Sequence, residues 1–120
     1  MAIPNVQELT NKKCQPCGKG EVPFPLGQAR EYSAQLPDWD LAENGKSISR
    51  QYAMKDFLAA VRFIDKIAEV AETEDHHPDL HLTGYRKLQI ELATHSIGGL
   101  SENDFIVAAK IDQLPKELKK

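Results

Sequence analysis

Apolar residues recur at helical spacing from Lys55 to about Thr73, and this stretch is the candidate main helix. One stripe steps by four and three residues and consists of Phe57, Val61, Ile64, Ala68 and Ala71. A second set widens it, namely Leu58, Ala60, Phe63, Ile67 and Val70. The spacing predicts an amphipathic helix, and the width of the apolar surface indicates burial on more than one side. Such a helix would lie across a sheet and also meet another subunit.

Alternation between apolar and polar residues predicts strands after this helix. Leu88, Ile90 and Leu92 alternate with charged or polar residues over positions 87–92, which is typical of a half-buried antiparallel strand. A shorter extended segment covers residues 80–83, just before this strand. The two segments are therefore expected to pair.

Residues 39–54 are predicted to form a hairpin. Asn44-Gly45 joins two extended runs, and this dipeptide is a strong hairpin signal because both central residues of a type I′ turn need positive φ. On the returning strand, Arg50 shares a face with apolar residues such as Ile48. We therefore expect Arg50 at an edge of the sheet or reaching out of it.

Local signals at helix ends predict two further helices. A short amphipathic helix runs from about Leu26 to Leu36 and is stopped by Pro37. Ser101 is placed to cap the last helix, with Asp104 three residues later as its partner in a capping box.

These elements follow the order α-β-β-α-β-β-α, which predicts an α+β fold with a four-stranded antiparallel sheet and helices packed on one face. Residues 1–27 hold four of the seven prolines and three of the seven glycines, with little periodicity. We expect them to form an irregular N-terminal arm. Residues 28–120 are expected to form a single α+β domain.

Composition excludes some classes of function. Of the 120 residues, 41% are hydrophobic and 28% charged, with a formal net charge of −3, which is typical of a soluble globular protein. This balance gives no electrostatic reason to expect direct binding of nucleic acid. No apolar run approaches the roughly 20 residues of a membrane span, and the N-terminus lacks a basic segment followed by an apolar one. The expected location is the cytoplasm, with no membrane partner.

The two cysteines form one Cys-x-x-Cys pair, Cys14 and Cys17. A reducing compartment would keep them as thiols, and a single such pair is at best half of a zinc site. Three interpretations stay open: free thiols, a labile disulfide, and a zinc site completed by other ligands.

Candidate chemistry is concentrated after the main helix. All four histidines lie between positions 76 and 95, and imidazole is the side chain suited to proton transfer near neutral pH. Acidic residues crowd the end of the helix, where the macrodipole disfavours them; they are Glu69, Glu72, Glu74 and Asp75. Pro78 favours an extended His77 and so ends the helix. A stretch that violates a local preference in this way is typical of a functional site.

The residues alone leave three interpretations of this cluster. If the end of the helix meets the end of the last strand, three imidazoles and two carboxylates converge: His76, His77, His95, Glu72 and Asp75. They could form an acid/base site, or some of them could bind a metal ion, although adjacent histidines in an extended segment point in opposite directions. The third interpretation is structural, with imidazoles bonded to the backbone, and it is the favoured one for His81.

Two spaced motifs are the most specific feature of the chain. They are Glu72-x-x-Asp75-His76-His77-Pro78, followed by Tyr85, and Leu92-x-Thr94-His95-x-x-Gly98-Gly99-Leu100-Ser101-x-x-Asp104. Together they resemble the motifs of the pterin-4a-carbinolamine dehydratase family, over roughly Trp39 to Ile111. The expected order of elements agrees with the fold of that family. The arm with its two cysteines is not part of these motifs.

The resemblance implies an enzyme, a hydro-lyase that eliminates water from a 4a-hydroxytetrahydropterin. The product is the quinonoid dihydropterin of tetrahydropterin recycling, and the resemblance implies neither a metal nor an organic cofactor. Loss of hydroxide from C4a needs an acid, and formation of the new C=N bond needs removal of the N5 proton. By position, His76, His77 and His95 are the expected catalytic set, without a decision on which of them is the acid.

The resemblance also implies residues that bind or orient the substrate, namely Glu72, Asp75, Pro78, Leu80, Thr94 and Asp104. Asp75 is expected to orient an imidazole or hold its charge. Glu72 is expected to face the amide-guanidine edge of the pterin, which a carboxylate can engage in two hydrogen bonds. Leu80 stands where animal members often carry an aromatic residue, so it supplies an apolar wall without ring stacking.

A second class of function is a non-catalytic pterin- or protein-binding module. The resemblance includes animal proteins that act as dimerisation cofactors for a homeodomain transcription factor, and a family that forms dimers of dimers. The two-sided main helix fits self-association into a homodimer or homotetramer.

Overall fold

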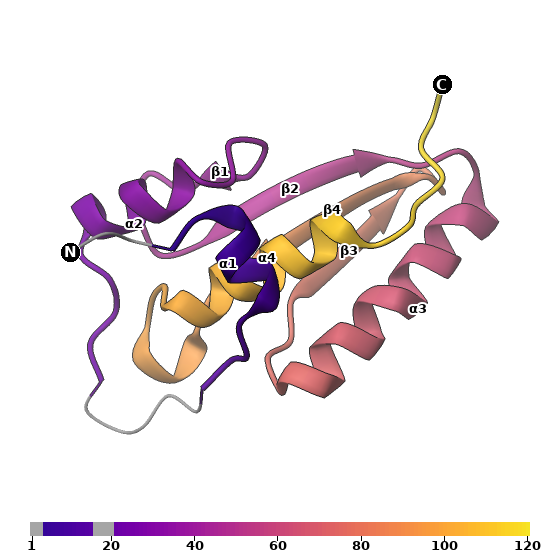
Figure 1. Cartoon of the computed structure of the whole chain (residues 1–120). Helices are drawn as coiled ribbons and strands as arrows, with labels where there is room; N and C mark the ends of the chain where they lie inside the picture. The colour runs from indigo at the N-terminus through magenta and orange to yellow at the C-terminus, as the bar shows by residue number, and fades with distance from the viewer. Residues whose placement is uncertain (1–3, 16–20) are drawn as a thin grey trace.

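The computed structural model describes residues 4–15 and 21–120 and contains a four-stranded sheet covered by helices (Figure 1). The helices are α1 (Val6–Asn11), α2 (Leu26–Ser33), α3 (Phe57–Glu74) and α4 (Glu102–Gln113), with a single 3-10 turn, η1 (His95–Ile97). The strands are β1 (Asp40–Leu41), β2 (Ile48–Ala53), β3 (Asp79–Thr83) and β4 (Lys87–Leu92).

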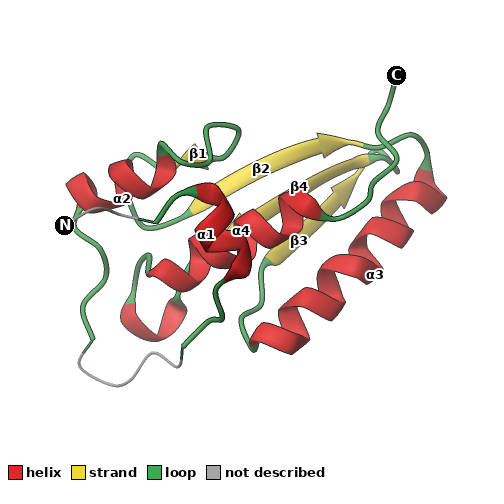
Figure 2. Cartoon of the chain, viewed as in Figure 1, coloured by secondary structure: helices red, strands yellow, loops and turns green. Residues whose placement is uncertain are grey.

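Neighbouring strands of the sheet are all antiparallel, in the order β1-β2-β4-β3. Helices α3 and α4 cover one face of the sheet (Figure 2), while polar residues such as Lys87 and Gln89 line the other. The predicted α+β class, the four-stranded antiparallel sheet and its one-sided helical cover are confirmed. None of the helices in the described ranges combines the length and the hydrophobicity needed to cross a membrane.

The hairpin of β1 and β2 forms as predicted, but its turn is not of type I′. Gly45 has a φ of 70°, whereas Asn44 does not adopt positive φ. The Gly45 N–H donates to the Ala42 carbonyl at 2.8 Å, and the Ala42 N–H donates to the Ser47 carbonyl at 3.0 Å. The connection is thus longer than two residues, which removes the need for positive φ at both central positions. The Asn44 side chain instead accepts from the Lys46 N–H at 2.9 Å.

The main helix forms, and the second predicted set supplies most of its buried face, whereas only Ala71 of the first stripe is buried. The buried residues of α3 are Ala59, Ala60, Phe63, Ile67 and Ala71. Phe63 packs edge-on against Tyr52 of β2, with ring centroids 5.1 Å apart. Phe57, Leu58 and Val61 are exposed, at 52%, 64% and 36%. Two adjoining apolar faces fit the same periodicity, so spacing alone cannot tell which of them meets the sheet.

Helix α4 begins with the predicted capping box and is buried on nearly all sides. The Asp104 carboxylate accepts the Ser101 N–H at 3.0 Å. Residues 103–109 are all buried. Helix α1 lies against α4 on the side away from the sheet (Figure 1), and the rings of Phe24 and Tyr32 pack near that of Phe105.

The presence of α1 differs from the expectation of an irregular arm. Asn5 caps this helix by accepting the Glu8 N–H at 2.8 Å, and the Glu8 carboxylate accepts the Asn5 N–H at 3.2 Å. Leu9 is fully buried and belongs to the core. The Asn-x-x-Glu spacing is a capping signal that the abundance of proline and glycine around it concealed.

Arg50 reaches out of the sheet, as predicted, toward the last turn of α4. Its guanidinium donates to the Asp112 carboxylate at 3.0 Å. The Trp39 indole and the Tyr52 hydroxyl donate to the same carboxylate, at 3.0 and 2.5 Å. Burial, together with this bond to Asp112, raises the pKa of Tyr52, so the hydroxyl stays a donor. These bonds tie the end of α4 to the hairpin and to the segment before it.

Candidate active site

Three segments meet beside the C-terminal end of α3. They are the loop after α3, the turn after β4, and the first turn of α4. Helix α3 ends at Glu74 because Asp75 adopts the left-handed conformation, with a φ of 51°. This reversal directs the chain toward β3 and places the two adjacent histidines, His76 and His77, between the helix and the strand.

His76 is bound to a buried carboxylate. Its Nε2 lies 2.6 Å from Oδ1 of Asp104, and the two side chains are 12% and 0% exposed. Because a carboxylate accepts hydrogen bonds, Nε2 carries the proton in this contact. Nδ1 of the neutral ring is then the nitrogen with a lone pair. The bond joins the loop after α3 to the first turn of α4, across 28 positions of sequence.

The second oxygen of Asp104 is held by the neighbouring turn. Oδ2 accepts the Thr94 hydroxyl at 2.8 Å and the Ser101 N–H at 3.0 Å. The hydroxyls of Thr94 and Ser101 lie 2.9 Å apart. The carboxylate thus has defined partners on both oxygens, and it can fix the orientation and tautomer of His76.

His77 lies in a more open environment. Its Nε2 is 2.5 Å from Oε2 of Glu72, in the last turns of α3, and the two side chains are 56% and 76% exposed. Of the two adjacent rings, that of His76 is thus covered and that of His77 faces solvent.

His95 is the exposed first residue of η1. It follows Thr94, whose N–H donates to the Gly99 carbonyl at 2.7 Å and closes the loop. Gly98 ends η1 with a φ of 73°, a conformation that favours glycine. His95 is therefore one residue away from the hydroxyl that bonds to Asp104.

Other predicted site residues lie at the edge of this group or apart from it. Asp75 is exposed and Pro78 is half-buried. Leu80 is half-buried against the core and pairs with Ile90. His81 is exposed on β3 and, by alternation, projects to the opposite face of the sheet from Leu80.

Some features of this region could not be predicted from the sequence motifs. Ser101 was expected only as a helix cap, yet it also holds Asp104 and Thr94 in one network. Tyr85 of the motif lies in the turn at the far end of β3 from His77. Cys14 is half-buried, whereas Cys17 lies outside the described residues. Within the described part of the chain, no three His, Cys, Asp or Glu residues are grouped so as to hold a metal ion.

The arrangement suits proton transfer on a bound molecule. One imidazole is oriented by a buried carboxylate, a second is paired with an exposed carboxylate, and a third begins the adjacent turn. An oriented imidazole can accept a proton at the nitrogen that the carboxylate does not occupy, and exposed imidazoles can supply one. The geometry thus supports acid/base chemistry at an open surface.

Comparison with known proteins places this site in a family context. Residues 24–114 match the family described as pterin 4 alpha carbinolamine dehydratase. A protein of Halorhodospira halophila, named "Putative pterin-4-alpha-carbinolamine dehydratase", is 44% identical over 106 residues, which cover 88% of this chain and 96% of that protein. The mitochondrial pterin-4-alpha-carbinolamine dehydratase 2 of Arabidopsis thaliana is 40% identical over 116 residues, covering 94% of this chain and 62% of that protein.

A solved structure also resembles the fold. The transcriptional coactivator/pterin dehydratase from Brucella melitensis aligns with a TM-score of 0.69 and 31% identity, over 75% of this chain and 95% of that one.

Proposed function

The chain belongs to the pterin 4 alpha carbinolamine dehydratase family, and from this premise we propose that it is a hydro-lyase that dehydrates a 4a-hydroxytetrahydropterin by histidine-based acid/base catalysis. The observation that carries the histidine mechanism is the bond between His76 and the buried Asp104. A buried carboxylate held by a hydroxyl and an N–H is a partner that orients an imidazole for proton transfer.

The proposed step uses one base and one acid. Nδ1 of His76 removes the proton from N5 of the pterin, and the electron pair of that bond forms the C4a=N5 double bond. The C4a–O bond breaks, and an exposed imidazole, His77 or His95, gives its proton to the departing hydroxyl, which leaves as water. The products are the quinonoid dihydropterin and one water molecule. After this step His76 carries an additional proton and the acid has lost one. Proton transfer through solvent restores both imidazoles to their starting protonation states.

Carboxylates at the end of α3 are proposed to hold the pterin. Glu72 can engage the amide-guanidine edge through two hydrogen bonds, and its exposure makes it accessible to the ligand. Leu80 and Pro78, both half-buried, supply apolar surface beside the histidines. Asp75 is exposed next to His76 and is proposed to orient the substrate or an imidazole.

The proposal is tested by the rate at which freshly generated 4a-hydroxytetrahydropterin disappears, followed by ultraviolet absorbance. We expect the wild type to accelerate this reaction and His95→Ala to lower kcat/KM by roughly 100- to 10,000-fold, the usual contribution of an acid/base group. His81→Ala is the matched control, because His81 lies on β3 and projects to the other face of the sheet. Its kcat/KM should equal that of the wild type.

Circular dichroism would confirm that each variant is folded. A folded wild type that does not accelerate the reaction would contradict the dehydratase proposal. That result would favour the alternative, a non-catalytic pterin- or protein-binding module.

The predicted cytoplasmic location stays a prediction, since the Arabidopsis relative carries "mitochondrial" in its name.

The exposed apolar face of α3 supports the proposal of a homo-oligomer. Phe57, Leu58 and Val61 are large apolar residues that face solvent along the N-terminal half of this helix. Clustered exposed apolar residues of this kind are typical of a protein interface, and a second copy of the chain offers a self-complementary one.

A charge on this face is expected to reduce the assembly. Leu58→Glu should lower the molar mass in solution, measured by light scattering, because a buried unpaired carboxylate is costly at an interface. Val22→Glu is the control, since Val22 is 80% exposed and lies outside α3. An unchanged mass for Leu58→Glu would show that α3 does not form the interface.

A further inference from the structure

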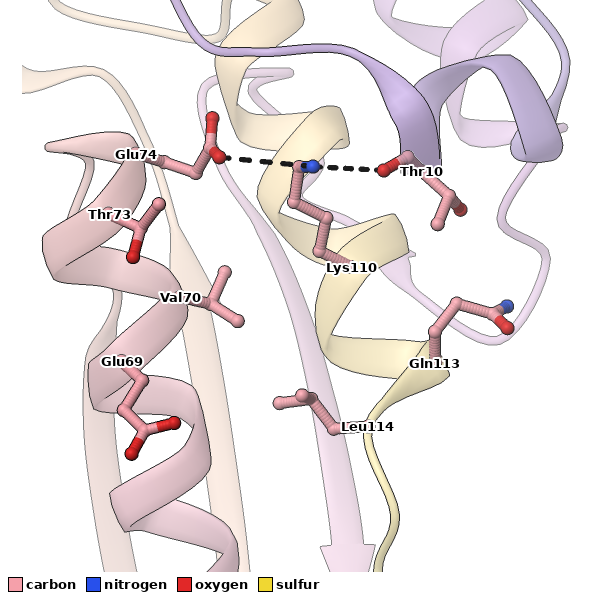
Figure 3. Close-up of a pocket in the computed structure, with 8 residues that line it drawn as sticks. All are labelled: Thr10, Glu69, Val70, Thr73, Glu74, Lys110, Gln113 and Leu114. Carbon is pink, nitrogen blue, oxygen red and sulfur yellow. Dashed lines mark hydrogen bonds and ion pairs between the residues drawn. The ribbon is translucent and has the colours of Figure 1, made fainter.

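The N-terminal arm, taken here as its described residues 4–15 and 21–24, packs against the elements that carry the candidate site. Leu9 of α1 is fully buried in the core. Lys110 of α4 donates to the Thr10 carbonyl at 2.9 Å and lies 3.8 Å from a carboxylate oxygen of Glu74. Figure 3 shows this link, with Lys110 between Thr10 and Glu74 in the groove between α3 and α4. One lysine therefore connects the arm to the last residue of α3.

Cys14 and Gln15 extend this connection to the start of α4. The Cys14 N–H donates to the Glu74 carboxylate at 2.8 Å. The Gln15 N–H donates to the Asn103 side chain at 2.9 Å, and the Asn103 amide donates back to the Gln15 carbonyl at 2.6 Å. Two adjacent residues of the arm thus bond to both helices at the junction where they meet.

The partners of the arm lie close in sequence to His76 and Asp104, the two residues of the buried hydrogen bond. Glu74 lies two residues before His76, and Asn103 lies directly before Asp104. The bond between His76 and Asp104 spans the same junction between the end of α3 and the start of α4. The geometry of that bond depends on the separation of these two helix ends. The arm holds the separation from outside the pair.

The contacts of the arm explain how an acid is tolerated at position 74, the last residue of α3. An acid at the C-terminal end of a helix opposes the macrodipole, and this side chain is only 7% exposed. The Cys14 N–H and the Lys110 ammonium offset that cost. Without the arm, Glu74 would lose the hydrogen bond from the Cys14 N–H, and its carboxylate would repel the neighbouring carbonyl groups at the end of the helix.

A second contact of the arm reaches the loop that carries His95. The Phe24 N–H donates to the Leu100 carbonyl at 2.8 Å. Pro23 packs so closely on Gly99 that a Cβ at position 99 would come within 2.6 Å of the proline ring. Gly99 is the residue whose carbonyl accepts the Thr94 N–H. The arm therefore contacts the end of the helix that precedes His76 and His77, and also the turn that bears His95.

We infer that the N-terminal arm is a positioning element of the active site, which fixes the junction between the end of α3 and the start of α4 through Cys14, Gln15, Glu74 and Asn103. The arm does not touch the reacting atoms. It acts through the bond between His76 and Asp104, and its catalytic consequence rests on the proposed function. Its structural consequence, the fixed geometry of that bond, can be measured without any substrate.

Because the arm binds Asn103 through the backbone N–H of Gln15, a substitution at position 15 can remove this contact without any change in α3 or α4. Gln15→Pro removes the N–H that donates to Asn103, because proline has no amide hydrogen. Gln15→Ala is the matched control, since it keeps both backbone groups that bond to Asn103. Asn103→Ala removes the other side of the same contact and is an independent variant. All three would be made in a Cys17→Ser chain, which leaves Cys14 as its one cysteine.

Alkylation of Cys14 by iodoacetamide at pH 8 reports whether the arm is docked. Burial, with a smaller contribution from Glu74, raises the pKa of Cys14 to about 12, and the thiolate is the reactive form. Release of the arm into water returns the thiol to its ordinary pKa, so we expect alkylation to accelerate on the order of 100-fold or more in Gln15→Pro and Asn103→Ala. Both variants keep Glu74, so acceleration reports that Cys14 has left its buried position beside that carboxylate.

The imidazole N–H resonance of His76 reports the geometry of the pair by NMR. In the wild type, the Nε2–H proton is expected to be protected from exchange by its bond to Asp104. In Gln15→Pro and Asn103→Ala this resonance should broaden or vanish, and kcat should fall roughly 10- to 100-fold with little change in KM, because misplacement of a catalytic group affects the chemical step. Gln15→Ala should retain wild-type values in every measurement.

The outcomes separate this inference from the proposed function. Rapid alkylation of Cys14 with an unchanged His76 resonance and unchanged kcat would overturn the inference, because the arm would be released without effect on the pair. Slow alkylation in both variants would also overturn it, since these contacts would not hold the arm. Loss of the resonance in a protein whose wild type dehydrates no pterin would sustain the inference and reject the dehydratase proposal.

Discussion

Replacing His76 with alanine is expected to lower kcat/KM for dehydration by roughly 100- to 10,000-fold, as loss of a general base does. His76 is the imidazole with the most restricted environment, because Asp104 fixes its Nε2 and only 12% of the side chain is exposed. Alanine also removes a donor from a buried carboxylate, which costs about 1–3 kcal/mol of unfolding free energy. Activity would be followed by ultraviolet absorbance of the hydroxypterin, and stability by urea unfolding.

His76→Gln separates the chemical effect from the structural one. The glutamine amide can still donate to Asp104, but it cannot accept and release a proton near neutral pH. We expect its unfolding free energy to lie closer to that of the wild type than that of His76→Ala, while both variants lose activity to a similar extent. Near wild-type activity in His76→Gln would show that the residue only holds Asp104 and that another group is the base.

Local signals in the sequence predicted the elements around the site well. The capping box at Ser101 and the alternation over 87–92 depend on near neighbours only, and both are present in the structure. The contact between His76 and Asp104 joins residues 28 positions apart. Both residues belong to the sequence motifs, but the spacing within the motifs does not show how far apart the two side chains lie in the folded protein. That distance depends on how α3 and α4 pack.

The errors have a common physical origin. Burial of the first stripe of α3 was wrong except at Ala71, because two adjoining apolar faces fit one period and the packing of Phe63 on Tyr52 places the second face against the sheet. The turn at Asn44 differs because a longer loop relieves the requirement for positive φ. In each case a tertiary contact or a loop length, rather than the local residue type, determines the conformation.

The crowding of acids at the end of α3 illustrates the same limit. The sequence showed that these acids oppose the macrodipole, but it could not distinguish their partners. Glu72 bonds to the exposed His77, whereas Glu74 bonds to the arm. Glu72 therefore lies in the candidate site, whereas Glu74 contacts the arm outside it, although the two acids are two residues apart. Only long-range contacts assign these separate roles.

Replacing Asp104 is expected to have the largest combined effect on stability and activity. The carboxylate is fully buried and accepts from His76, Thr94 and the Ser101 N–H. In Asp104→Ala these donors lose their acceptor, and α4 loses one side of its capping box. We expect a decrease of about 3–5 kcal/mol in unfolding free energy, as for other broken buried networks, together with loss of measurable dehydration. Urea unfolding and the ultraviolet assay would measure the two effects.

Asp104→Asn is the sharper variant, because it keeps the shape and one acceptor oxygen. If that oxygen stays with Thr94 and Ser101, the amide presents its NH₂ group to His76. The imidazole must then accept at Nε2 and carry its proton on Nδ1, so the nitrogen proposed as the base is blocked. In the Ser-His-Asp triad, this exchange of tautomer has a large catalytic cost. We therefore expect at least a roughly 100-fold loss in kcat/KM, with a smaller loss of stability than in Asp104→Ala.

A double-mutant comparison completes the test of this pair. If Asp104 acts through His76, then adding Asp104→Asn to His76→Gln should lower kcat/KM little further, because residues that act as a unit are not additive. Independent roles would instead multiply the two losses. Wild-type activity in a folded Asp104→Asn protein would show that the tautomer of His76 is irrelevant. The base would then have to be sought at His77 or His95, whose rings the buried carboxylate does not hold.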